Sequence, residues 1–217
     1  MPIKPKHKVN ENPIEMKFED LFGTPRYATE LLIPFIPKNS VIWECASGEG
    51  RITKVLEEHK YCVFTTDIRF NPDWTDRTWN FLDDEDIPDL EDNTVIITNP
   101  PFSLKRKFFN NCLSYGFPFA LLIPADLCGW LIDAIRIHHC QKLIPNRRIS
   151  YITPDMLNRI NRELETNYSC LEEVPKNILP RFTSSMFHSM WLCKGFNLPG
   201  QTETFVDLSL KDKENIL

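Results

Sequence analysis

Hydrophobic and polar positions alternate along the chain in two distinct patterns. Short runs rich in β-branched and aromatic residues lie at residues 41–45, 61–67, 94–98 and 117–125. Apolar residues recur every three or four positions in the segments between them, at residues 51–60, 105–116 and 127–139. The first pattern is typical of buried strands and the second of amphipathic helices. Together they predict an α/β, Rossmann-like fold with a mostly parallel sheet and helices on both faces.

Weaker patterns extend the sheet and divide the chain. Strand-like composition at residues 79–82, 147–153 and 186–195 gives about seven strands, and residues 27–35 predict a further helix. Residues 154–185 are polar and proline-bounded with one short helical piece, so we interpret them as an insertion. The length of 217 residues suits one domain.

We therefore expect three parts. Residues 1–20 form an N-terminal arm, residues 21–195 form the domain that includes the insertion 154–185, and residues 196–217 form a C-terminal tail. The arm and the tail lack strong periodicity, and we expect poor order in both.

Composition narrows the class of protein. A hydrophobic content of 42% with 25% charged residues is typical of a globular chain, and no apolar run approaches the ~18 residues of a membrane span. The seven cysteines are scattered without a CxxC pair, so we expect reduced thiols and no metal site. The first residues resemble no targeting segment, and we expect an intracellular location, in the cytoplasm or nucleus, including those of a virus-infected cell.

The net charge of −5 conceals an uneven distribution. Residues 66–92 hold ten acidic and two basic residues, whereas residues 99–150 hold seven Lys or Arg against two Asp. The second segment can therefore form a local basic face that attracts phosphate. Lys105, Arg147 and Arg148 are its candidate contacts to nucleic acid, with ordinary solvated surface as the alternative.

Two features point to a nucleotide-like ligand at the ends of predicted strands. Gly48 and Gly50, two of only seven glycines, lie in a turn between a strand and a helix, where backbone amides can approach a ligand. Asp67 ends the next strand, where an acid can accept hydrogen bonds from ribose hydroxyls. The carboxyl ends of parallel strands share one edge of the sheet, so we expect these groups to meet there.

The segment Asn99-Pro100-Pro101-Phe102 follows a third strand. Two prolines forfeit two hydrogen-bond donors where a strand meets its helix, which is costly for structure alone. The Asn99 amide oxygen and the Pro100 carbonyl can instead accept both hydrogens of a planar amino group, while Phe102 offers a stacking face. The motif thus indicates a site for an amino group on a flat substrate.

With these motifs, residues 22–195 resemble the class I S-adenosylmethionine-dependent methyltransferases that carry an (N/D)PP(Y/F) motif, and more narrowly the phage-type DNA adenine methyltransferases. The resemblance implies an S-adenosylmethionine site, converting the cofactor to S-adenosylhomocysteine without a metal. Its cofactor contacts would be Thr24, Pro25, Glu44, Ala46, Gly48, Gly50, Asp67, Asn80 and Phe81. The family carries an acid where this chain has Asn80, and Asp83 is the candidate replacement.

The resemblance also implies where chemistry and recognition take place. Asn99, Pro100, Pro101 and Phe102 would form the catalytic pocket for a flipped base. Target recognition lies late in the family's order, which makes the insertion the candidate recognition segment, with Arg159 and Arg162 as tentative DNA contacts. A solvated loop is the alternative for this acidic segment.

The expected function is therefore methylation of the exocyclic N6 amino group of adenine in DNA. An RNA methyltransferase acting on adenine or guanine amino groups is the nearest alternative. A protein glutamine-amide methyltransferase and a catalytically silent binding subunit remain further alternatives. DNA is the expected partner and no membrane is involved, while the sequence leaves a homo-oligomer open.

Overall fold

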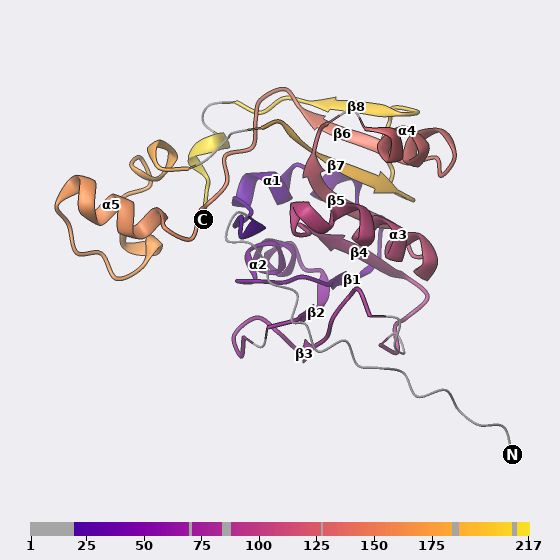
Figure 1. Cartoon of the computed structure of the whole chain (residues 1–217), viewed down its shortest axis with the longest axis horizontal. Helices are drawn as coiled ribbons and strands as arrows, with labels where there is room; N and C mark the ends of the chain where they lie inside the picture. Colours follow the sequence, from indigo (N-terminus) through magenta and orange to yellow (C-terminus); the bar gives the residue numbers. More distant parts are fainter. Residues whose placement is uncertain (1–19, 70, 84–87, 127, 184–186, 210–211) are drawn as a thin grey trace, which may run out of the picture.

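The computed structural model describes residues 20–69, 71–83, 88–126, 128–183, 187–209 and 212–217 (Figure 1). Apart from Asp20, the predicted N-terminal arm lies outside the described residues. Within these ranges no helix is both long enough and apolar enough to cross a membrane.

Eight strands form one mixed sheet in the order β3-β2-β1-β4-β5-β7-β6-β8. The strands are β1 Val41–Glu44, β2 Cys62–Asp67, β3 Arg77–Thr78, β4 Thr94–Thr98, β5 Phe119–Pro124, β6 Gln141–Pro145, β7 Ser189–Lys194 and β8 Glu203–Val206. Every neighbouring pair is parallel except those of β7, which runs antiparallel to both β5 and β6. The predicted α/β class with a mostly parallel sheet is confirmed.

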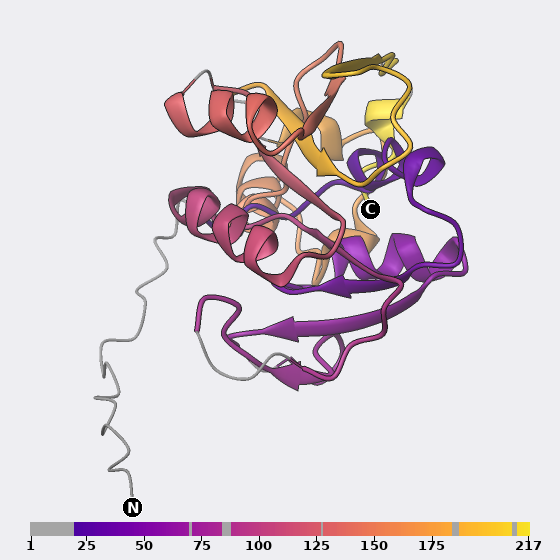
Figure 2. The ribbon, with the colours of Figure 1, turned by 90° about the vertical axis from the view of Figure 1, so that its right-hand side faces the viewer.

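Helices cover both faces of the sheet (Figure 2). They are α1 Arg26–Glu30, α2 Arg51–Glu58, α3 Lys105–Tyr115 and α4 Gly129–Arg136, whereas α5 Met156–Leu164 stands to one side of the sheet (Figure 1). Successive strand residues point to opposite faces, so Ile42 of β1 packs in one apolar cluster with α1 and α2. Its neighbour Trp43 packs in the other cluster, with α3 and α4. Two cores therefore hold the central strands rigidly in place.

Two predicted strands are displaced along the chain. β3 ends at Thr78, and Asn80 then accepts a hydrogen bond from the Leu82 amide at 3.1 Å, which turns the chain where residues 79–82 were expected to extend. Residues 147–153 form isolated bridges and no strand, and one of these bridges joins Gly23 to Ile152. The sixth strand is instead β6. It begins with two polar residues, so the hydrophobic pattern did not predict it.

The C-terminal segment and the first helix also differ from expectation. Residues 203–206 form β8, which pairs in parallel with β6, and Ile216 is buried near the end of the chain. The helix expected over residues 27–35 is shorter, because α1 ends at Glu30 and a 3-10 turn, Ile33–Phe35, follows. Pro34 within that turn has no amide hydrogen to continue an α-helix.

Candidate functional site

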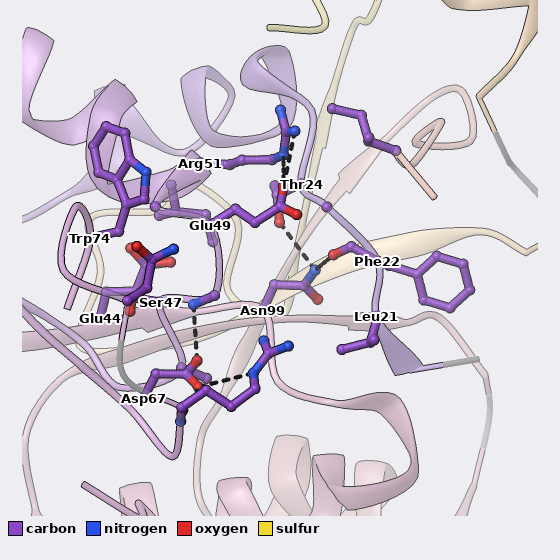
Figure 3. A pocket seen from close by; sticks show the side chains of 18 of the residues that line it. Leu21, Phe22, Thr24, Glu44, Ser47, Glu49, Arg51, Asp67, Trp74 and Asn99 are labelled. Atoms are coloured by element: carbon purple, nitrogen blue, oxygen red, sulfur yellow. Dashed lines mark hydrogen bonds and ion pairs between the residues drawn. The ribbon is translucent and has the colours of Figure 1, made fainter. Parts of the chain in front are cut away.

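A cavity of about 920 Å³ opens at the carboxyl ends of β1, β2 and β4 (Figure 3). The strand order reverses between β1 and β4, the position at which open α/β sheets bind ligands. Its walls bring together the turn after β1, Asp67 at the end of β2 and Asn99 after β4. The sequence predicted this meeting.

The two glycines of the turn are required for different reasons. Gly48 and Gly50 both have positive φ angles, of 56° and 66°. A Cβ added to Gly50 would lie 2.2 Å from the Trp74 ring, whereas one on Gly48 would meet nothing closer than Arg69 at 4.0 Å. Packing against Trp74 therefore leaves no room for a side chain at Gly50. At Gly48 the positive φ favours glycine, and the space beside it stays open to the cavity.

The Asp67 carboxylate anchors the turn. It is 6% exposed and accepts hydrogen bonds from the amides of Gly48 and Arg69, both at 2.9 Å. The Arg69 side chain approaches the same carboxylate, with Nε to Oδ1 at 3.5 Å. Two carboxylate oxygens offer about four lone-pair sites. The contacts shown leave acceptor capacity for hydroxyl donors in the cavity.

Glu44 places a second carboxyl group at the cavity wall. Burial raises the pKa of Glu44 to about 8. A hydrogen bond from the Thr53 hydroxyl acts in the opposite direction but is the smaller effect. The protonated form of Glu44 is therefore favoured at neutral pH in the protein without a ligand. A cationic group bound beside Glu44 would favour its charged form instead.

We expect Glu44→Gln to change how stability depends on pH. Between pH 4.5 and about 8 the folded protein retains a proton on Glu44 that the unfolded chain releases, so wild-type stability falls as pH rises. Glutamine carries no such proton and should gain about 3 to 5 kcal/mol over the wild type between pH 5 and pH 9. Urea unfolding across this range measures the gain. The exposed control Glu91→Gln should follow the wild type, and parallel curves for Glu44→Gln and wild type would contradict the assignment.

Asn99 has both of its amide hydrogens engaged. Nδ2 donates to the Phe22 carbonyl at 3.0 Å and to the Thr24 hydroxyl at 3.1 Å. Oδ1 is buried and accepts no hydrogen bond from any described residue. An unpaired buried acceptor costs roughly 1–3 kcal/mol, so a donor entering the cavity here would recover that cost.

The other residues of the NPPF segment lie differently from one another. Pro101 lines the cavity, whereas Pro100 is buried and neither it nor Phe102 belongs to the lining. The Phe102 ring stacks on Phe22 with centroids 5.4 Å apart and meets Phe187 edge-on at 5.2 Å. The structure therefore covers one face of the ring that the sequence offered for stacking.

The remaining predicted cofactor contacts surround the same cavity. Thr24, Ala46, Asn80 and Phe81 line it, while Pro25 is buried and does not belong to the lining. Asn80 donates to Asp83 at 2.7 Å, so these two candidates for the adenine contact bond to each other. Phe81 is buried and its ring stacks with a neighbouring ring of α3.

The tentative nucleic-acid contacts are dispersed. Lys105 pairs with Asp126 at 3.7 Å, and Arg147 and Arg148 are exposed outside the cavity lining. Arg159 directs its guanidinium to the Phe182 carbonyl at 3.5 Å. Arg162 is exposed on α5.

The insertion itself borders the cavity. Leu157 of α5 and residues 169–172 contribute to its wall, as does Thr153 just before the insertion. A segment expected to read the target thus lies at the cavity rim.

Sequence reasoning missed three residues of the site. Trp74 covers Gly50, Arg51 enters the cavity wall paired with Glu49 at 3.0 Å, and Phe22 contacts Asn99. The close spacing of the glycines alone indicated a neighbour packed against the turn. Phe22 left no such signal in the sequence, because its contact with Asn99 uses a main-chain carbonyl. Within the described part of the chain, no cluster of three or more His, Cys, Asp or Glu could hold a metal ion.

No protein-family model matches the chain, and no curated protein matches its sequence.

Proposed function

We propose that this protein is an S-adenosylmethionine-dependent methyltransferase that modifies the N6 amino group of adenine in DNA. The observation that carries the proposal is the shared cavity of the glycine turn, Asp67 and Asn99. A ribose acceptor and an amine acceptor on one wall suit a nucleoside cofactor beside a substrate amino group.

The cavity residues fit the cofactor. The cavity volume of about 920 Å³ lies within the ~300–1,000 Å³ common for ligand sites. The open side of Gly48 would receive the methionine portion, Asp67 the ribose hydroxyls, and buried Glu44 the cationic end. When bound, the cofactor would supply an electrophilic methyl group on a sulfonium.

Asn99 would prepare the amino group for attack. An adenine amino nitrogen shares its lone pair with the ring and is a poor nucleophile while it stays planar. A hydrogen bond from the amine to Asn99 Oδ1 would hold the nitrogen toward the cofactor and favour a more pyramidal geometry. Transfer would then need mainly positioning. The new N–C bond would form as the sulfonium S–C bond breaks, and the methylated amine would afterwards release its proton to water.

The proposed DNA substrate follows from the target base and the cavity rim. A base in a duplex must leave the stack to reach Asn99, at a cost of a few kcal/mol. The basic balance of residues 99–150 supports contact with a phosphate backbone, and the insertion borders the cavity that the base would enter. Arg159 and Arg162 stay predicted DNA contacts.

Asp67→Ala is expected to weaken S-adenosylmethionine binding. Loss of hydrogen bonds to a charged acceptor costs roughly 1–3 kcal/mol, which is about 5- to 150-fold in affinity. Asp67→Asn keeps an oxygen for the Gly48 amide and should lose less. Calorimetric titration measures both, with exposed Asp73→Ala as the control. Wild-type affinity in Asp67→Ala would refute the ribose role.

Incubation with methyl-labelled cofactor and separate DNA and RNA pools tests the proposed activity. The proposal expects label in DNA, released as N6-methyl-2′-deoxyadenosine after digestion to nucleosides. Label in RNA alone would favour the nearest alternative, and label in neither would reject nucleic-acid methylation.

A further inference from the structure

The segment of residues 20–24, which we call the brace, lies against the NPPF segment. Ser103 donates to the Asp20 carboxylate from its amide at 3.0 Å and from its hydroxyl at 2.6 Å. Gly23 and Ile152 exchange two backbone hydrogen bonds, of 2.8 and 3.0 Å. The brace is therefore anchored on both sides of its contact with Asn99.

Aromatic packing holds the middle of the brace. The Phe22 ring stacks on Phe102 at an interplanar angle of 26° and contacts Tyr151 at 5.5 Å and Phe187 at 5.9 Å. A ring held by three others fixes the main chain that carries it. The Phe22 carbonyl thus occupies a defined place opposite Asn99.

The brace determines which way the Asn99 amide faces. A main-chain carbonyl only accepts hydrogen bonds, so the atom of Asn99 opposite the Phe22 oxygen must be the nitrogen. The Thr24 hydroxyl accepts the second hydrogen, and Thr24 is 4% exposed, which shields this bond from water. Rotating the amide by 180° would set two carbonyl oxygens against each other.

We propose that Phe22 and Thr24 are positioning residues that fix the Asn99 amide so that only its oxygen is presented to the substrate. This inference rests on the proposed methyltransferase function. Asn99 lines the cavity, and the oxygen left for a donor is Oδ1, which is buried and has no partner among the described residues. An oriented acceptor selects an N–H donor, such as an amino group, over a ring nitrogen or carbonyl that itself accepts.

A double-mutant cycle tests the brace without substrate. Thr24→Val should lower the urea midpoint in the wild-type background and have little effect in an Asn99→Ala background, because the bond is already absent there. Thr29→Val is the matched control, since Thr29 is equally buried and its hydroxyl has no partner among the described residues. Additive effects of Thr24→Val and Asn99→Ala would overturn the proposal.

Kinetics test the positioning role. Thr24→Val should lower kcat by roughly 10- to 100-fold, because a small misplacement of a reacting group has effects of this size. Its KM for DNA and its affinity for S-adenosylmethionine should stay within about twofold of wild type, because this inference assigns the Thr24 hydroxyl to Asn99 and not to the cofactor contact that the sequence predicted. Thr24→Ser, which keeps the hydroxyl, should restore kcat.

The outcomes separate the brace from the proposed function. Coupling in the cycle together with a kcat-specific loss and serine rescue supports the positioning role. A loss of cofactor affinity as large as the loss of kcat would make Thr24 a cofactor contact and overturn it. An inactive wild-type protein would reject the proposed function and the positioning role with it, even where the cycle shows coupling.

Discussion

Asn99→Ala is expected to lower methyl transfer by roughly 100- to 1,000-fold, the effect of removing one preorganised polar contact to the reacting group. The fold and cofactor binding should survive, because the glycine turn and Asp67 lie on other strands and keep their contacts. Only the partners of the amide hydrogens, the Phe22 carbonyl and the Thr24 hydroxyl, lose a bond.

Methyl incorporation into DNA, measured beside calorimetric cofactor affinity, distinguishes this result from general damage. Asn110→Ala is the control, since Asn110 is exposed on α3 and does not line the cavity. Full activity in Asn99→Ala would remove Asn99 from the mechanism. Loss of both activity and cofactor affinity would assign it to cofactor binding instead.

Gly50→Ala is expected to be the most destabilising substitution in the turn. An L-residue at a φ of 66° costs about 1–2 kcal/mol, and forcing a methyl group into the Trp74 ring adds about 1–3 kcal/mol. The two contributions predict a loss of about 2 to 5 kcal/mol in the free energy of unfolding, together with weaker cofactor binding.

Two controls separate the backbone and packing contributions. Gly116 has a φ of 78° and an added Cβ would meet no described neighbour within 4 Å, so Gly116→Ala reports the backbone cost alone. Adding Trp74→Ala to Gly50→Ala should recover the packing part. Chemical denaturation measures the free energy of unfolding of the wild type, Gly50→Ala, Gly116→Ala and the double variant. Equal losses for Gly50→Ala and Gly116→Ala would show that Trp74 yields without cost.

The sequence predicted the site better than its surroundings. The meeting of Gly48, Asp67 and Asn99 follows from one rule, because each comes after a strand of one parallel sheet and such strands end at a common edge. The rule needs only the strand assignments, and hydrophobic runs such as residues 94–98 make those clear. Local sequence was therefore sufficient to bring Gly48, Asp67 and Asn99 to one cavity.

The missed features depend on contacts that no local pattern encodes. Asn99 and Phe22 are 77 residues apart, and the bond uses a main-chain carbonyl that any residue possesses. β8 is a short edge strand with Phe205 exposed, so its sequence lacks the buried runs of the central strands. The strand predicted over residues 79–82 does not form, because the Asn80 side chain accepts a hydrogen bond from the Leu82 amide and turns the chain there.

Nucleoside analysis of host DNA after expression tests the central claim most directly. DNA from cells that express the wild-type chain should contain more N6-methyladenine than DNA from cells that express Asn99→Ala at the same level, in a host without an adenine methyltransferase of its own. N6-methyladenine absent from both samples, with soluble protein that binds S-adenosylmethionine in each, would contradict the proposed methylation of DNA adenine.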